Sequence, residues 1–417
     1  MTTEDDVIVI GAGIAGLCCG LELKRRGIPF RILEASDGVG GRVRTDLVEG
    51  YRLDRGFQVL LTAYPEARAV LDYPSLDLKP FFNGCYIQRK DRRIRFGDPF
   101  RNLSEAWSSL TAPVGTLRDR WRILKLRGWL KAWDAAELAR EMAPEDTLAE
   151  LEGRGFSKGI IDNFFKPFFG GVFLEQELKT SKSFFWFAFK MFSEGEVSVP
   201  AKGIGAIADQ LADQLPEGCL QFNTRVQSVA NGGYTLAGGE QRDARAVIIA
   251  TDGASAAHLL GRDRLPHQTV TNMYFSAESS PLPEHPPGIL LCPEVEWINN
   301  LHVVSDIAPE CAPEGKALIS VSVVRSEDLS NAELAEKVRG ELHALFGPEV
   351  AHWQLLRVYR IEGALPKASA SEAQILVQAA TEKGAYLCGD YLGVPSLQEA
   401  MRRGREAGES VSARLQP

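Results

Sequence analysis

The feature that most constrains the fold lies near the start of the chain, where a short apolar run meets closely spaced glycines. Residues 7–16 read V-I-V-I-G-A-G-I-A-G. Four consecutive β-branched residues predict a strand that is buried on both faces, as in a parallel sheet. Gly11, Gly13 and Gly16 then give the spacing G-x-G-x-x-G. The leucine-containing run after them, with a basic end and a glycine stop, predicts a helix.

Each glycine has a mechanical role in this pattern. Gly11 permits a tight turn, Gly13 lets a pyrophosphate approach the backbone, and Gly16 lets the helix pack on the strand. The first turn of the helix, which includes Ala15, directs free N–H groups and a positive dipole end toward the anion. A second strand over 30–33 ends in Glu34, about 20 residues further on, where a carboxylate accepts hydrogen bonds from a ribose. Together these signals predict a dinucleotide-binding α/β unit.

Composition excludes several other classes of protein. The chain has 417 residues, 45% of them hydrophobic, which is enough for two or three domains. A net charge of −8 does not suggest a nucleic-acid-binding surface. The seven cysteines lack framework spacing and predict reduced thiols, and the six histidines show no metal-ligand spacing. An acidic start without a leader pattern, and no long apolar run, predict a cytoplasmic protein without a membrane span.

A second glycine-rich run follows Glu34 and helps to decide which dinucleotide is bound. Residues 34–45 read E-A-S-D-G-V-G-G-R-V-R-T. This run resembles the motif E-A-x-x-R-x-G-G-R-x-x-[S/T] of the flavin amine oxidase, protoporphyrinogen oxidase and phytoene desaturase superfamily, which holds FAD. The resemblance implies that Ala35, Gly40 and Gly41 approach FAD closely and that Arg42 meets the diphosphate with its forked donors. Gly38 departs from the pattern, because the family usually has arginine there.

Three further stretches resemble FAD contacts of the same superfamily. The segment around Gly56, Phe57 and Gln58 corresponds to the one that passes the isoalloxazine ring. The pattern T-R-V-x-x-V over 224–229 implies that Val226 touches the adenine through its backbone. The run A-Y-L-C-G-D over 385–390 is followed by a helix-forming segment, which implies that Gly389, Asp390 and Leu397 contact FAD. A helix N-terminus near the flavin pyrimidine favours anionic reduced flavin.

The middle of the chain is aromatic. Half of the 20 phenylalanines lie between Phe164 and Phe192, and they suit either a helical core or the wall of a substrate cavity. In the desaturases and protoporphyrinogen oxidases a similar segment lines that cavity, so Phe168 and Phe169 are expected to line it here. Tyr359 stands where protoporphyrinogen oxidases have a tryptophan near the flavin, and it is also expected to line the cavity.

These patterns predict an α/β fold. We expect a Rossmann-like FAD-binding domain of the glutathione-reductase type with an inserted α+β substrate domain. Residues 1–60, 200–261 and 366–417 would form the FAD domain, and residues 61–199 and 262–365 the substrate domain. Strands are expected over 268–276, 316–324 and 353–361, with a helix over 332–346.

The resemblance implies an FAD-dependent oxidoreductase that removes hydride from a large hydrophobic substrate, such as a carotenoid, tetrapyrrole or lipid. A flavin-containing amine oxidase is the alternative. Its usual lysine near the flavin would fall at Thr271, and its aromatic cage at Tyr359, so both features are missing. A non-redox flavoprotein or lipid isomerase is a further alternative. Spacing identifies no catalytic acid or base and no metal site, and it leaves the electron acceptor and oligomeric state open.

Two further expectations concern the cofactor and the membrane. Cys388 is the one cysteine near the C-terminal motif and is expected to point into the core, so FAD should be bound non-covalently. The segment 100–133 combines four tryptophans with interleaved arginines and lysines. Such a segment suits either a solvated helical face or peripheral contact with an anionic membrane, and it corresponds to membrane-contacting helices of protoporphyrinogen oxidases.

Overall fold

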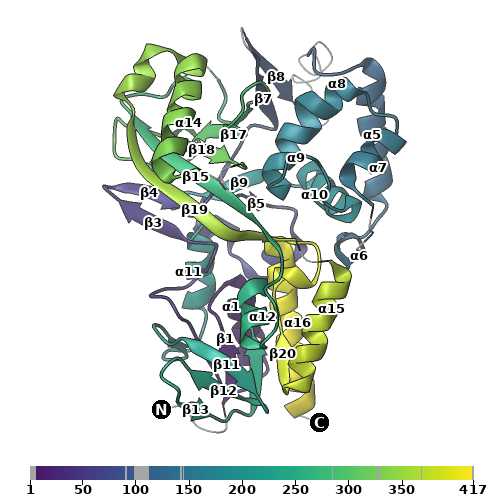
Figure 1. Cartoon of the computed structure of the whole chain (residues 1–417), viewed down its shortest axis with the longest axis vertical. Helices are drawn as coiled ribbons and strands as arrows, with labels where there is room; N and C mark the ends of the chain where they lie inside the picture. Colours follow the sequence, from purple (N-terminus) through teal and green to yellow (C-terminus); the bar gives the residue numbers. More distant parts are fainter. Residues whose placement is uncertain are drawn as a thin grey trace.

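The chain forms a mixed α/β structure with two lobes. The computed structural model describes residues 6–89, 92–97, 112–140, 143, 145–283, 285–325, 329–367 and 369–415. One lobe holds both ends of the described chain, and the other carries a large sheet on one side and a group of helices on the other (Figure 1).

A parallel five-stranded sheet forms the core of the first lobe. Its spatial order is β10 (Leu220–Gln221), β2 (Phe30–Leu33), β1 (Val7–Ile10), β14 (Ala246–Ile249) and β20 (Ala385–Leu387). All of its strand pairs are parallel. The run over 7–10 is therefore a buried parallel strand, as its sequence predicts.

Both faces of this sheet are covered, which explains why β1 is apolar throughout. Val7 and Val9 pack toward a cluster that contains the helices α1 (Ile14–Arg25), α11 (Ala206–Asp213) and α16 (Leu397–Leu415). Ile8 and Ile10 pack on the opposite side, toward α12 (Gly253–Leu259) and α15 (Ala370–Glu382). A meander of β11 (Val226–Ala230), β12 (Gly233–Leu236) and β13 (Gln241–Arg242) covers the same side.

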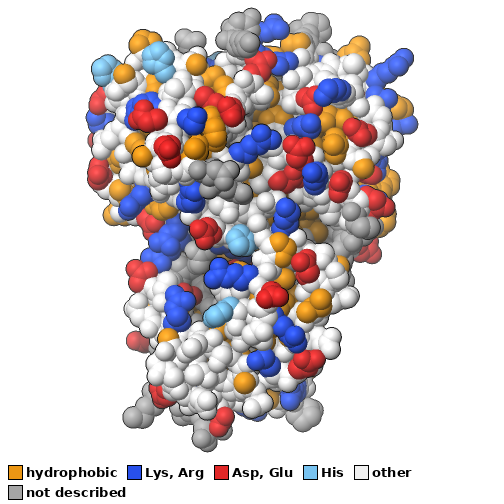
Figure 2. Space-filling model, viewed as in Figure 1, with side chains coloured by type: hydrophobic (Ala, Val, Ile, Leu, Met, Phe, Trp, Pro, Cys, Tyr) orange, Lys and Arg blue, Asp and Glu red, His pale blue; other side chains and the backbone are white. Residues whose placement is uncertain are grey.

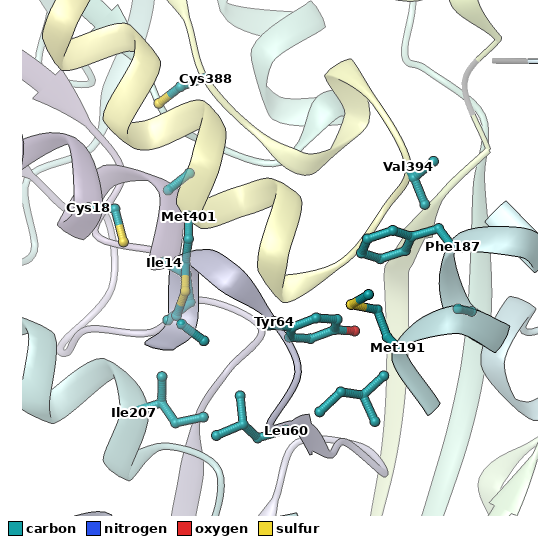
Figure 3. Close-up of a cluster of buried hydrophobic side chains, with 14 of the residues drawn as sticks. Ile14, Cys18, Leu60, Tyr64, Phe187, Met191, Ile207, Cys388, Val394 and Met401 are labelled. Atoms are coloured by element: carbon teal, nitrogen blue, oxygen red, sulfur yellow. The ribbon is translucent and has the colours of Figure 1, made fainter. Parts of the chain in front are cut away.

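The C-terminal helix α16 lies directly against α1, so the two ends of the sequence share one core. A Cβ on Gly404 would lie 2.2 Å from the carbonyl oxygen of Ala15, which shows how closely the helices approach. Figure 3 shows Met401 and Val394 beside Ile14, Tyr64 and Phe187, in a cluster that continues from the first lobe into the helical part of the second. This shared core fixes the position of one lobe on the other.

A seven-stranded sheet organises the second lobe. Its order is β19 (Gln354–Pro366), β15 (His267–Ala277), β18 (Ala317–Val323), β17 (Asn300–Val303), β16 (Ile289–Leu291), β7 (Gly84–Gln88) and β8 (Arg93–Gly97). The strands expected near 268, 316 and 353 are all present. Helix α14 (Asn331–Phe346) packs on the face that carries Met273, Phe275 and Ile319. The opposite face is left for the site.

The helical part of the second lobe contains most of the phenylalanines. Its elements are α5 (Leu117–Lys131), α6 (Ala135–Arg140), α7 (Thr147–Gly153), α8 (Lys158–Ile160), the π-helix η1 (Ile161–Phe165), α9 (Lys166–Phe173) and α10 (Lys182–Glu194). Phe165, Phe173 and Phe185 are fully buried in this helical core. The core interpretation of the aromatic segment is therefore correct for these residues.

The remaining elements are short. They are β3 (Thr45–Val48), β4 (Tyr51–Asp54), β5 (Leu60–Leu61), α2 (Pro65–Val70), α3 (Tyr73–Leu76), β6 (Leu78–Pro80), β9 (Val197–Pro200), α13 (Val304–Ile307), η2 (Pro309–Cys311), η3 (Pro348–His352) and η4 (Asp390–Leu392). Among the described residues, no helix is long and apolar enough to cross a membrane.

Candidate active site

One large cavity runs from the first lobe into the second. Its volume is about 1530 Å³, and its lining extends from the glycine turn after β1 to the phenylalanines of α9 and α10. Figure 2 shows a hollow between the lobes, with Lys or Arg and His side chains at its edge. Among the cavity-lining residues, His258 and Arg264 are exposed and His267 is half-buried. The cavity thus has two ends. We call the end in the first lobe, which begins at the glycine turn after β1, the cradle, and the end in the second lobe, which contains the phenylalanines, the aromatic end.

The first glycine turn has the geometry that its sequence predicts. Gly11 has a φ of +108°, and a Cβ there would lie 2.9 Å from the carbonyl oxygen of Ala250, on the neighbouring strand end. A Cβ on Gly13 would meet nothing within 4 Å, so this side of the turn is open space in the cavity. A Cβ on Gly16 would lie 2.0 Å from the carbonyl oxygen of Gly11. Gly16 is outside the lining and serves the packing of helix on turn, whereas Ala15 lines the cavity.

Glu34 is fixed at the end of β2 by two backbone donors. One carboxylate oxygen accepts a hydrogen bond from the N–H of Ala12 at 2.8 Å, and the other accepts one from the N–H of Ser36 at 2.8 Å. Each oxygen keeps a further lone pair. Glu34 and Ala35 both line the cavity, so the carboxylate is held in place and can accept hydrogen bonds from hydroxyl groups of a ligand.

The second glycine run lies against the first. The N–H of Gly40 donates to the carbonyl oxygen of Ala12 at 2.9 Å, and Gly40 and Gly41 have φ values of +101° and +59°. Both line the cavity. At Gly38, where the related motif has arginine, an added Cβ would lie 3.5 Å from the guanidinium of Arg44. The space beside Gly38 is thus taken by an arginine from further along the chain.

Arg42 and Asp390 form an ion pair in the cavity wall. A guanidinium nitrogen of Arg42 lies 2.6 Å from a carboxylate oxygen of Asp390, and another donates to the carbonyl oxygen of Ala364 at 3.1 Å. Burial opposes ionisation of Arg42, but the Asp390 carboxylate outweighs it and raises the pKa of Arg42. Two residues expected from separate motifs therefore meet, and the arginine stays charged.

The segment after β4 forms the middle of the cavity. The side-chain amide of Gln58 donates to the carbonyl oxygen of Arg42 at 2.7 Å, which ties this segment to the second glycine run. A Cβ on Gly56 would lie 2.9 Å from the Cδ1 of Ile361, so a glycine is needed for this close approach. The ring of Phe57 lies 4.5 Å from that of His302. Gly56, Phe57 and Gln58 all line the cavity.

The remaining cradle residues come from the far parts of the sequence. Val226, at the start of β11, lines the cavity near the end of β2, and Gly389, Asp390 and Leu397 line it from the C-terminal segment. Leu397 begins α16, so the N-terminus of this helix faces the cavity. Cys388 is fully buried between α16 and α1 and is outside the lining (Figure 3).

The aromatic end contains Phe168 and Phe169, as expected, but not Tyr359. Phe168 and Phe169 line the cavity together with Phe164, Phe189 and Phe192. Tyr359 is outside the lining, which corrects the expectation that it borders the substrate. Its hydroxyl donates to Asp46 at 2.9 Å, and its ring packs edge-on to Tyr274. Tyr359 thus contacts the β3–β4 hairpin through Asp46. Ile361, two residues further along β19, lines the cavity instead.

The position compared with the amine oxidase lysine also differs from its expected geometry. Thr271 is fully buried and outside the lining, whereas its neighbour Val270 lines the cavity. Side chains alternate between the faces of a strand, so Thr271 lies on the face of β15 that carries Met273. The described residues that line the cavity include no lysine.

Several lining residues were not anticipated from the sequence. Asn300, Ser322 and Val324 contribute from the sheet, and Arg120, Ile123, Leu124 and Arg127 contribute from α5. Strand alternation could have indicated which residues of β17 and β18 share a face, but only the strand order shows that this face borders the cavity. Among the described residues, no group of three His, Cys, Asp or Glu side chains could hold a metal ion.

Comparison with known proteins gives a family match over most of the chain. Residues 14–412 match the model of the flavin containing amine oxidoreductases. Protoporphyrinogen oxidase 2 of Arabidopsis thaliana is 29% identical over 166 residues, which cover 40% of this chain and 32% of the plant protein. The 1-hydroxycarotenoid 3,4-desaturase of a Flavobacterium strain is 43% identical over 49 residues, 12% of this chain and 10% of that protein. The matched parts therefore span a third or less of these relatives.

A solved structure of wild-type putrescine oxidase bound to putrescine has the same fold. The TM-score is 0.73 with 16% sequence identity, and the alignment covers 99% of this chain and 100% of that chain. The family match over 14–412 carries the assignment. The chain belongs to the family of flavin containing amine oxidoreductases, and its cofactor is FAD.

Proposed function

We propose that this protein removes a hydride from a large hydrophobic substrate held in the aromatic end of the cavity. The observation that carries the proposal is the continuity of one 1530 Å³ cavity, which joins the glycine-rich cradle to a wall of phenylalanines. Such a wall suits a carotenoid-, tetrapyrrole- or lipid-like molecule. Relatives named as a protoporphyrinogen oxidase and a hydroxycarotenoid desaturase support this substrate class.

The cradle residues fit FAD. Gly13 borders open space, as a pyrophosphate requires, and the fixed Glu34 carboxylate suits a ribose. We infer that Gly40, Gly41, Arg42 and Asp390 hold the diphosphate and ribityl region, and that Val226 contacts the adenine. Gly56, Phe57, Gln58 and Leu397 would border the isoalloxazine ring. The buried position of Cys388 supports non-covalent attachment, so acid precipitation should release all the yellow colour into the supernatant.

The chain's own residues would act mainly by positioning and by excluding water. FAD, when bound, supplies the hydride acceptor. The phenylalanine wall would hold a substrate C–H close to it and keep solvent out. Burial lowers the pKa of His302, behind Phe57, to about 3, so this imidazole is neutral near neutral pH. We assign no acid or base catalyst.

We propose the domain division suggested by the sequence. The strands of the parallel sheet fall within 1–60, 200–261 and 366–417, and those of the seven-stranded sheet fall within 61–199 and 262–365, apart from the last residue of β19. This distribution supports an FAD domain that two segments of the substrate domain interrupt.

An amine oxidase remains the second candidate, because the family description names amines. The absence of lysine among the described lining residues counts against it. A non-redox lipid-binding flavoprotein is the third candidate. Anaerobic mixing of the FAD-loaded protein with a panel of amines, polyenes and porphyrinogens separates them. Bleaching of the flavin by a hydrophobic compound supports our proposal, bleaching by amines alone supports the second candidate, and tight lipid binding without bleaching supports the third.

We also propose that helix α5 touches an anionic membrane from which the substrate is collected. Leu117, Trp121 and Leu124 form an apolar stripe along this helix, and the first two are 68% and 55% exposed, so the stripe faces outward there. Leu124 on the same stripe is partly exposed and also lines the cavity. Trp129 instead packs on Trp186, and residues 98–111, which include Trp107, lie outside the described residues. The stripe thus connects the molecular surface to the cavity.

A further inference from the structure

Two polar side chains interrupt the apolar wall of the cavity. Asn300 on β17 and Ser322 on β18 face each other across neighbouring strands, and both line the cavity. Directly opposed residues in an antiparallel pair bring their Cβ atoms to about 5 Å. Asn300 is 1% exposed and Ser322 is 5% exposed. Both belong to a buried polar cluster that also contains Asn272, Asn299 and Ser320, and of these five residues only Asn300 and Ser322 line the cavity.

The neighbouring hydrogen bonds fix the orientation of the Asn300 amide. The Asn299 amide nitrogen donates to the carbonyl oxygen of Pro167 at 3.1 Å and to the Asn300 side-chain oxygen at 2.8 Å. Because the Pro167 carbonyl can only accept, this atom of Asn299 is the nitrogen, and the Asn300 atom beside it is the oxygen. Gly171 leaves room for this contact, since a Cβ there would lie 3.1 Å from that oxygen. The Asn300 NH₂ group is therefore turned away from Asn299, and among the described residues it has no hydrogen-bond partner.

The Ser322 hydroxyl has the complementary orientation. It donates to the side-chain oxygen of Asn272 at 3.0 Å, and Asn272 in turn donates to Ser320 at 3.1 Å. With its proton directed toward Asn272, the Ser322 oxygen has lone pairs to offer. The pair thus presents a donor from Asn300 and an acceptor from Ser322 at neighbouring points of one wall.

A buried donor without a partner destabilises the protein unless something else accepts its hydrogen bond. We propose that a hydroxyl group of the hydrophobic substrate binds between Asn300 and Ser322, accepting from the first and donating to the second. This inference rests on the proposed hydrophobic substrate and narrows it to a molecule with a hydroxyl in its apolar frame. The pair selects a neutral group, because neither residue carries a charge. It is a specificity device and takes no part in hydride removal.

A matched pair of probes tests the inference on the FAD-loaded protein. Geranylgeraniol and the hydrocarbon in which its CH₂OH is replaced by CH₃ are titrated, and the change in flavin absorbance gives each Kd. We expect the alcohol to bind about tenfold more tightly, the effect of two modest hydrogen bonds. Asn300→Leu should remove this preference while the hydrocarbon binds as well as before. Ser322→Ala should reduce the preference to about threefold.

Ser320→Ala is the control, because it also removes a hydroxyl beside Asn272 but lies outside the cavity lining. It should keep the wild-type preference. If Asn300→Leu does not retain FAD, the comparison of Ser322→Ala with Ser320→Ala decides the question. Equal binding of both probes by the wild type, or an unchanged preference in Ser322→Ala, would overturn the inference and leave the proposed function standing. Binding of neither probe would contradict the proposed function and the inference with it.

Discussion

The two ends of the cavity are built in different ways. The cradle end consists largely of backbone, because glycines at positive φ bring the turns after β1 and β2 together, and one carboxylate and one ion pair complete it. The aromatic end consists of side chains from helices and from one face of a sheet. A backbone cradle needs particular residues at fixed spacing, whereas a side-chain wall can be built from many sequences. We therefore expect substitutions in the two ends to have separable effects, on cofactor binding and on substrate binding.

The largest expected effect is the loss of FAD from Gly13→Val. The added side chain would occupy the open space where the diphosphate is proposed to lie, so the purified protein should be colourless. Gly340→Val in α14 is the matched control, because a Cβ there also meets nothing within 4 Å but faces solvent. Absorbance near 450 nm, roughly the flavin band, measures the cofactor content. A yellow Gly13→Val protein would contradict the backbone-cradle interpretation.

Substitutions of Phe165 and Phe168 distinguish a phenylalanine of the helical core from one of the cavity wall. Phe165 is fully buried, so Phe165→Ala should lower the free energy of unfolding by about 3–5 kcal/mol. Phe168 is half-buried and lines the cavity, so Phe168→Ala should cost less stability but weaken binding of a polyene probe. Urea unfolding and probe titration measure the two effects. If both variants lose the same stability and neither changes probe binding, Phe168 belongs to the core and not to the wall.

The Arg42→Gln variant tests whether the charged part of the cradle binds the FAD phosphates. Arg42→Gln should remove the charge-assisted hydrogen bonds that we propose Arg42 donates to the diphosphate. Such bonds contribute about 1.5–3 kcal/mol, so FAD should bind roughly 10- to 100-fold more weakly. Riboflavin, which lacks phosphate, should be affected much less. Arg44→Gln serves as the control, since Arg44 pairs with Asp37 and lies outside the cavity lining. An equal loss for FAD and riboflavin would show that Arg42 acts on the fold and not on the phosphates.

Asp54 ties the β3–β4 hairpin to the turn that leads back into the first lobe. Its carboxylate accepts hydrogen bonds from the Thr45 hydroxyl at 2.6 Å and from the N–H of Ile204 at 3.0 Å. Burial raises its pKa to about 6 from 3.8. Between these values the folded protein binds a proton that the unfolded chain has lost, so the free energy of unfolding should fall as pH rises from about 4 to 6.

Asp54→Asn should abolish this contribution, which is of the order of 1–3 kcal/mol. Urea unfolding at about pH 4.5, near the start of this range, and at about pH 7, beyond its end, measures the difference. The exposed Asp213→Asn variant should follow the wild-type profile. If Asp54→Asn has the same pH dependence as the wild type, the Asp54 carboxyl does not titrate in this range.

The last prediction concerns α5. Changing Arg118, Arg122 and Lys125 to Glu should reduce flotation with anionic liposomes at low salt, because each basic residue contributes about 1 kcal/mol near such a surface. High salt should release the wild-type protein. Leu126→Ala is a useful comparison, since Leu126 is buried and should affect stability without affecting flotation. Wild-type protein that stays unbound at low salt would contradict the membrane proposal.

The glycine turns of the cradle end could be predicted from the sequence alone. The spacing of Gly11, Gly13 and Gly16 and the run over 34–42 can be read without a structure, because backbone conformations such as positive φ restrict the residue type directly. The expected strands of the second lobe were also readable from their apolar patterns. What these patterns could not give was the distance between motifs: Arg42 and Asp390 meet because β2 and β20, which precede them in the chain, belong to one parallel sheet.

Which residues line the aromatic end became clear only from the tertiary structure. Alternation along a strand shows which residues share a face, but strand order and register determine what that face meets. For this reason Tyr359 was expected at the cavity and contacts Asp46 instead, while Asn300 and Ser322 went unnoticed although they line it. The glycine turns of the cradle end depend on local backbone constraints, which short stretches of sequence reveal, whereas the aromatic end depends on long-range packing, which they do not.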